Sequence, residues 1–139
     1  MPSATADTNI YISALHFGGS PLRFLGLARA GAIRVDISDP ILAEVLRVLR
    51  DKFQWTSEKL DGAEALIARF TRRVTPTLTL DVVTEDPPDN RILECAVEAH
   101  SDAIVTGDGD LLRLGQYDGI PIMKVSDFLR HAIHLPIEL

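Results

Sequence analysis

The chain has 139 residues, of which 46% are hydrophobic, so we expect one domain, 1–139, that buries a core without disulfides or structural metal. Its 20 acidic and 14 basic residues give a formal charge of -6, which argues against a protein that coats polyanions. The single cysteine excludes an intramolecular disulfide framework, and neither a signal peptide nor a stretch of roughly 18 apolar residues is present, so we expect a cytoplasmic protein without membrane spans.

Strands alternate with helices along almost the whole chain. Apolar residues that recur at a helical period mark the helices, and short apolar or β-branched runs mark the strands. In chain order, we expect a strand at 3–6, helices at 9–16 and 21–30, a strand at 33–37, helices at 39–53 and about 57–73, a strand at 78–84, a helix from the turn at 86 through His100, a strand at 103–106, a helix at 110–114, a strand at 120–124 and a helix from 126 to about 134. This order predicts an α/β fold, a three-layer α/β/α sandwich with a mainly parallel central sheet.

Turn residues indicate where several helices begin. Ser20 is expected to cap the second helix, with Pro21 at its first position. The run Asp86-Pro87-Pro88-Asp89 resembles a capping box with two prolines in the first helical turn. Capping would explain Asp86, but it leaves unexplained why Asp89 lies on the apolar face of the same helix.

Four acidic residues, Asp7, Glu44, Asp89 and Asp108, fall near junctions between strands and helices. In an alternating α/β fold these junctions share one edge of the sheet. If the four side chains converge, they form a carboxylate cluster suited to a hard divalent ion such as Mg²⁺ or Mn²⁺. Each acid also has a local explanation, because Asp7 and Asp89 can cap helices, Glu44 can be a solvated first-turn acid and Asp108 can belong to a tight turn.

These residues belong to motifs in a recognisable order. The motifs are Asp7-Thr8-Asn9, Ser38-x-x-x-x-x-Glu44, Asp86-Pro-Pro-Asp89-Asn90-x-x-Leu93-x-x-Ala96 and Val105-Thr106-Gly107-Asp108-x-Asp110-Leu111-Leu112. From Asp7 to Phe128, the chain resembles the PIN-domain ribonucleases, and most closely their stand-alone prokaryotic members classed as toxins of toxin-antitoxin modules.

The resemblance implies a metal-dependent endoribonuclease with one or two Mg²⁺ or Mn²⁺ ions. The catalytic residues and metal ligands would be Asp7, Glu44, Asp89 and Asp108, and the supporting residues would be Asn9, Thr106 and Asp110. Asn9 could orient the carboxylate of Asp7. The partners implied are an RNA substrate and an antitoxin protein, and a homodimer is also expected.

The chemistry suits this set of residues. Phosphodiester hydrolysis needs an activated water and stabilisation of charge on the phosphoryl oxygens, and divalent metals can supply both. Two carboxylates about 4 Å apart repel by roughly 4 kcal/mol at an effective dielectric near 20, and a metal ion would relieve that repulsion. Unpaired RNA is the favoured substrate, because its backbone can enter a shallow cleft.

Basic side chains near the site would bind the substrate phosphates. The cluster available on the two middle helices is Arg47, Arg50, Lys52, Arg69, Arg72 and Arg73. Each of these residues, taken singly, can equally be part of a solvated helix face.

Two other classes of function remain open at this point. An aspartyl phosphatase of the haloacid dehalogenase type also places an Asp after the first strand, but it usually carries a second Asp two residues later, where this chain has Asn9. A catalytically silent PIN-like or receiver-like binding domain is the non-enzymatic alternative. The paired acids of a receiver are missing near Asp7, and the presence of all four acids argues against a silent nuclease.

Overall fold

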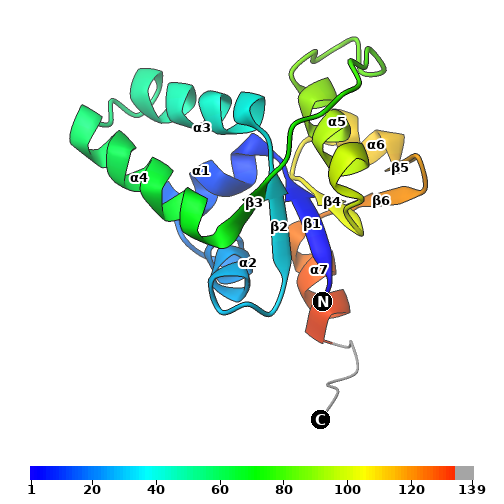
Figure 1. Ribbon diagram of the computed structural model, residues 1–139, viewed down its shortest axis with the longest axis horizontal. Coiled ribbons are helices and arrows are strands. Elements are labelled where there is room, and N and C mark those ends of the chain that lie inside the picture. Colours follow the sequence, from blue (N-terminus) through cyan, green and yellow to red (C-terminus); the bar gives the residue numbers. More distant parts are fainter. Residues whose placement is uncertain (134–139) are drawn as a thin grey trace.

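The computed structural model describes residues 1–133, which form a central sheet between layers of helices (Figure 1). Within these residues the sheet has the strand order β3-β2-β1-β4-β6-β5. The strands are β1 Ser3–Ala6, β2 Arg34–Ile37, β3 Thr71–Arg73, β4 Ala103–Val105, β5 Gln116–Tyr117 and β6 Ile120–Met123. The pairings are parallel apart from the antiparallel β5–β6 pair.

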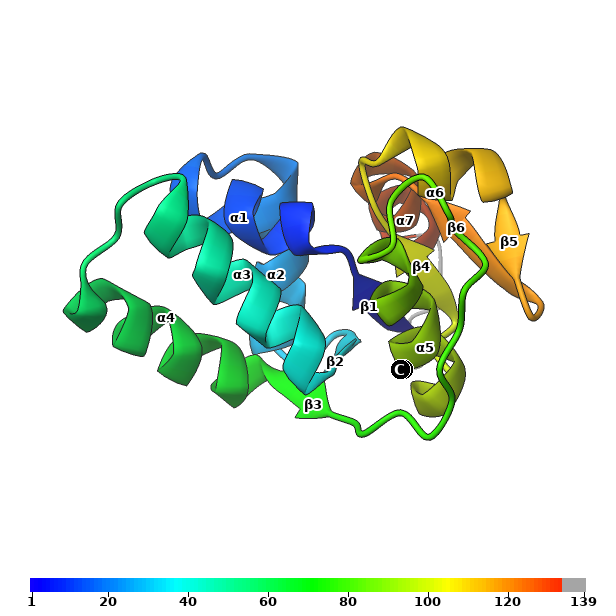
Figure 2. The same cartoon turned by 90° about the horizontal axis from the view of Figure 1, so that it is seen from above.

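Helices cover both faces of the sheet and complete the predicted three-layer fold. They are α1 Thr8–His16, α2 Ser20–Arg29, α3 Asp39–Asp51, α4 Ser57–Phe70, α5 Asp89–Ala99, α6 Gly109–Leu114 and α7 Val125–Ile133. Figures 1 and 2 show α5 on one face, against β1, β2 and β4, and α1 to α4 with α7 on the other. Within residues 1–133, each helix is too short or too polar to span a lipid bilayer.

The first strand is central and completely buried, although it contains only small residues. It pairs with β2 on one side and β4 on the other. Thr5 faces α5, where its hydroxyl lies 3.7 Å from the sulfur of Cys95, and it lies 2.8 Å from the hydroxyl of Ser101 just after that helix. The backbone N–H of Asp7 donates to the carbonyl of Val105 at 2.9 Å. The end of β1 is therefore held against the end of β4, and this contact places Asp7.

Two predicted elements are wrong. The helix expected over 57–73 ends at Phe70, because residues 71–73 pair with β2 as the edge strand β3. The strand expected at 78–84 does not form. The backbone N–H groups in that segment instead donate to side chains of α5: Leu80 to Glu94 at 2.7 Å, and both Val82 and Val83 to Asn90 at 2.8 and 2.9 Å. Side chains of α5 thus accept from the backbone N–H groups that would otherwise bond to a neighbouring strand.

Two predicted helix starts also differ. Gly19 stands at the cap position of α2, with a positive φ of 72°, so Ser20 is the first helical residue rather than the cap. Pro88 precedes α5 and no side chain caps that helix, so Asp86 does not form a capping box. The predicted end of the last helix at His134 lies outside the described residues.

Candidate metal centre

The acidic residues lie at the carboxyl ends of the central strands, on either side of β1. From β1 the strand order runs to β2 on one side and to β4 on the other, and in open α/β sheets such a switch point opens a crevice at the carboxyl ends of the strands. Asp7 follows β1 and Asp108 follows β4. They line a pocket of about 130 Å³ together with Thr8, Asn9, Glu44, Val48, Asp86, Pro88 and Asp89.

Asp7 is held at the floor of this pocket and is only 5% exposed. The hydroxyl of Thr106 donates to Asp7 Oδ2 at 2.7 Å and accepts from the backbone N–H of Asp108 at 2.9 Å. Burial raises the pKa of Asp7, and the hydrogen bond from Thr106 opposes this effect. Thr106 therefore links two of the predicted acids. Asn9 lines the same pocket and is exposed.

Asp89 is the most perturbed carboxyl group of the site. It begins α5 and is 5% exposed, and within the described part of the chain its Oδ2 atom is buried without a hydrogen-bond partner. Burial, followed by the close carboxylate of Asp108 and the charges of Asp7 and Asp86, raises the pKa of Asp89 to about 8. A buried carboxylate oxygen surrounded by other carboxylates lacks a positive partner.

Asp86, which was predicted to cap a helix, also belongs to the acidic cluster. One carboxylate oxygen from each of Asp86, Asp89, Asp108 and Asp110 lies within 4.8 Å of the others. Burial and the charges of Asp108 and Asp110 raise the pKa of Asp86. The two prolines after Asp86 turn the chain so that the carboxylates of Asp86 and Asp89 face the same space. The spacing Asp-Pro-Pro-Asp was the available signal.

Glu44 approaches from the opposite wall and has a basic partner. It lies on α3 and lines the pocket. Arg47, one turn later, donates to both of its carboxylate oxygens, at 2.6 and 3.0 Å. This hydrogen-bonded pair lowers the pKa of Glu44. The structure thus places Glu44 at the rim, outside the group of four mutually close acids.

The predicted RNA-binding cations are dispersed. Arg47 lies at the rim with Glu44, whereas Arg50 pairs with Asp51 and Arg73 pairs with Asp39. Lys52 and Arg69 are exposed.

Arg72 points away from the acidic pocket. It bonds to the buried Asp36 and to the carbonyl of Ala99 at the end of α5. An 11-residue helix is about 16 Å long, so Arg72 lies roughly that far from the acids at the start of α5.

The donor set fits a hard divalent cation. The pocket offers carboxylate oxygens from five acids, which are the ligands that Mg²⁺ and Mn²⁺ prefer. The buried Oδ2 atom of Asp89 has no hydrogen-bond partner among the described residues, and burial and the neighbouring carboxylates raise the pKa of Asp89, so a bound cation would stabilise this cluster. Asp86, Asp89 and Asp108 belong both to the pocket and to the group of close acids.

Comparisons with known proteins gave a family match and a similar solved structure. The family model described as the PIN domain matches residues 4–110. Among solved structures, the chain is similar to VapBC2 from Rickettsia felis bound to a DNA fragment from their promoter, with 14% sequence identity and a TM-score of 0.62; the match covers 86% of this chain and 96% of that chain. At this identity the likeness concerns the fold. No curated protein sequence matches the chain.

Proposed function

Because the chain belongs to the PIN-domain family, we propose that it is a metal-dependent endoribonuclease that hydrolyses phosphodiester bonds in RNA. The observation that carries this proposal is the buried, unpartnered oxygen of Asp89 among converging carboxylates. Such a cluster is electrostatically costly in a merely structural role. It becomes favourable when it holds cations.

The residues that would hold one or two Mg²⁺ or Mn²⁺ ions are Asp7, Glu44, Asp89 and Asp108, with Asp86 as an additional ligand. When bound, the ions would activate water and stabilise negative charge on the phosphoryl oxygens. The other residues position this set.

Thr106 keeps Asp7 in one orientation through its 2.7 Å hydrogen bond. Asp110 accepts from Arg113, which lies three residues later on α6 and is largely exposed. Arg47 and Arg113 are therefore the cations best placed to meet a substrate phosphate at the rim. Both would act as point contacts to the backbone and would carry no sequence preference.

We also propose that the protein is the toxin of a toxin-antitoxin pair. The similar solved structure of VapBC2 supports this role at the level of the fold. An antitoxin partner and a homodimer accordingly stay predictions. Light scattering of the purified chain would test the homodimer.

Cleavage assays test the enzymatic proposal directly. Unstructured and structured RNA would be incubated with the protein in Mg²⁺, Mn²⁺ or excess EDTA. We expect metal-dependent cleavage of unpaired RNA and a loss of at least about 100-fold in Asp89→Asn. Asp61→Asn is the matched control, because Asp61 is exposed on α4. Cleavage that persists in EDTA, or an Asp89→Asn variant as active as the parent, would favour a binding role instead.

A further inference from the structure

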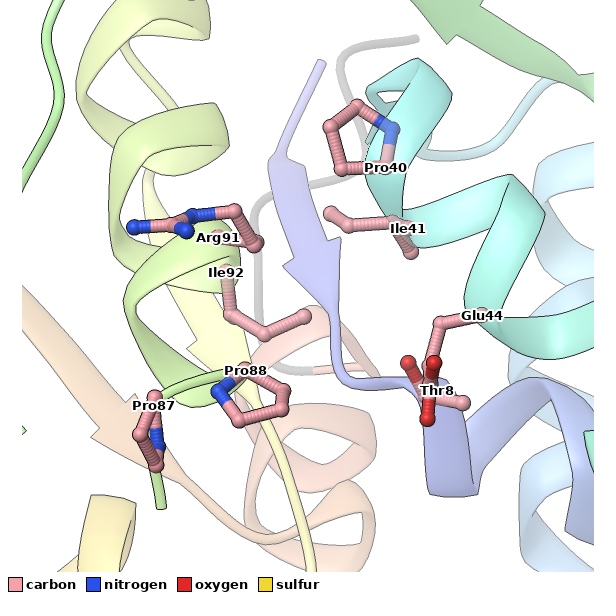
Figure 3. A pocket seen from close by; sticks show the side chains of 8 residues that line it. All are labelled: Thr8, Pro40, Ile41, Glu44, Pro87, Pro88, Arg91 and Ile92. Carbon is pink, nitrogen blue, oxygen red and sulfur yellow. The ribbon is translucent and has the colours of Figure 1, made fainter. Parts of the chain in front are cut away.

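An apolar slot adjoins the acidic pocket, and the proposed catalytic chemistry does not use it. It has a volume of about 270 Å³ and lies between the starts of α3 and α5 (Figure 3). Its lining residues are Thr8, Pro40, Ile41, Glu44, Pro87, Pro88, Arg91 and Ile92. Thr8, Glu44 and Pro88 also line the acidic pocket, so the two spaces are neighbours.

The slot has an apolar floor and proline walls. Ile41 and Ile92 are 1% and 2% exposed, so they form a fixed base. Pro40 stands on the α3 wall, while Pro87 and Pro88 stand on the α5 wall, and all three are exposed. In Figure 3 the charged end of Arg91 points away from the slot.

The guanidinium of Arg91 is occupied outside the slot. It donates to Glu94 at 2.8 Å and to the carbonyl of Leu80 at 3.0 Å. The slot therefore meets the aliphatic stem of Arg91 and not its charge.

We infer that this slot binds the nucleobase of an unpaired RNA nucleotide next to the phosphate that is cleaved. The inference rests on the proposed ribonuclease function, and it names the form of substrate that the site accepts. A flat base offers apolar faces that can lie between proline rings and above an aliphatic floor. Its phosphate would then lie toward Glu44 and Thr8, at the mouth of the acidic pocket.

The chemistry of the slot favours a base over a peptide segment. A peptide main chain carries an N–H and a carbonyl at almost every residue, and these groups need partners when buried. The three wall prolines have no backbone N–H to offer. The volume is also below the roughly 300–1,000 Å³ of pockets for drug-sized ligands, which suits one flat ring system.

A base can enter the slot only when it is unstacked from its neighbours. This requirement excludes nucleotides inside a duplex and selects loops, ends and single strands. Thr8 and Glu44 stand at the shared end, and the guanidinium of Arg91 is bound to Glu94 and to the carbonyl of Leu80, so binding should depend on the presence of a base more than on its identity. The slot would therefore confer preference for unpaired RNA with little sequence specificity.

Isoleucine methyl signals can test the slot without relying on cleavage. The protein would be labelled at its Ile δ1 methyl groups and titrated with an unstructured RNA hexamer in Ca²⁺. We expect ring-current shifts at Ile41 and Ile92, with Ile67 on α4 unmoved as an internal control. A hexamer with one abasic position should lose these shifts and bind about 5- to 100-fold more weakly when that position is the base held in the slot.

Proline variants provide the matched comparison. Pro40→Ala removes one wall, whereas Pro21→Ala removes a proline from the first turn of α2, and Pro21 lines neither pocket. Pro40→Ala should reduce the penalty for the abasic RNA, and Pro21→Ala should leave it unchanged. Equal binding of intact and abasic hexamers at every position, or unmoved Ile41 and Ile92 signals, would overturn the inference.

The same experiments separate this inference from the proposed function. Methyl shifts with intact RNA but no cleavage in Mg²⁺ or Mn²⁺ would refute the nuclease and keep the base-binding slot. Equal cleavage rates for intact and abasic RNA would support the nuclease function and refute base binding in the slot. Ile41 and Ile92 signals that move with protein concentration, and not with RNA, would assign the slot to contact with a second copy of the chain.

Discussion

Neutralising Asp89 should stabilise the protein when divalent metal is absent. In the native state the carboxyl group has a pKa of about 8, against 3.8 for an ordinary aspartate. The folded protein therefore keeps a proton at Asp89 that the unfolded chain releases as the pH rises from about 4 to about 8. Because the native state binds more protons in this window, the free energy of unfolding falls as pH rises.

The size of the effect follows from the same interval. One pKa unit corresponds to about 1.4 kcal/mol, so the difference between 3.8 and about 8 means that ionised Asp89 destabilises the native state by at most about 6 kcal/mol at pH 8. Movement of the neighbouring carboxylates and entry of water lower this value, and we expect Asp89→Asn to gain about 1–3 kcal/mol in EDTA at pH 8. The melting temperature should then rise by on the order of 5–10 °C.

Thermal melts at pH 5 and pH 8, in EDTA and in millimolar Mg²⁺ or Mn²⁺, measure this effect. The advantage of Asp89→Asn should shrink at pH 5, where Asp89 of the parent is protonated. Added metal should raise the melting temperature of the parent but not that of the variant, since ligands stabilise the state that binds them. The exposed Asp61→Asn variant should follow the parent. A destabilised Asp89→Asn in EDTA at pH 8, or a difference that does not change with pH, would refute the reasoning.

Two further predictions concern residues that hold the site in place. Thr106→Val removes the donor to Asp7, so the pKa of Asp7 should rise further. The rate of RNA cleavage should fall about 10-fold at neutral pH, and the acidic limb of its pH profile should move to higher pH. Thr106→Ser should restore both the rate and the pH profile. Asn90→Ala removes four hydrogen bonds to the segment 82–87. Urea unfolding should show that the free energy of unfolding falls by about 2–4 kcal/mol, and proteolysis of that segment should become faster. Glu85 is exposed, so Glu85→Ala should change neither measurement.

The predicted part of the fold depended on local patterns that the tertiary structure preserves. Segments with a helical apolar period alternate with short apolar runs along the chain, and this order predicted a parallel sheet covered by helices. The prediction holds because each strand and helix buries its apolar side chains. Asp7 and Asp108 were placed correctly at the pocket, since strand ends in such a sheet share one edge. Their roles as metal ligands stay predictions.

The predictions that were wrong concern residues whose interaction partners are distant in the sequence. Residues 78–84 have the pattern of a strand, but their hydrogen-bond partners belong to α5. Residues 71–73 continue the composition of α4, and only pairing with β2 makes them a strand. Asp86 had a sufficient local explanation as a cap, so nothing local required it at the pocket. Arg72 carries a charge that suits RNA, yet the buried carboxylate of Asp36 binds it.

The attachment of the loop before α5 has a consequence for how this protein can vary. Asn90, Glu94 and Glu98 stand four residues apart on α5, and each accepts from a backbone N–H in the segment 77–83. Backbone groups are the same whatever the side chain, so this segment can exchange most of its amino acids during evolution while the three helix positions stay fixed. Proline is the exception at Thr77, Leu80, Val82 and Val83, where it would delete the donated hydrogen. Related sequences should therefore show a variable loop beside an unvarying polar row.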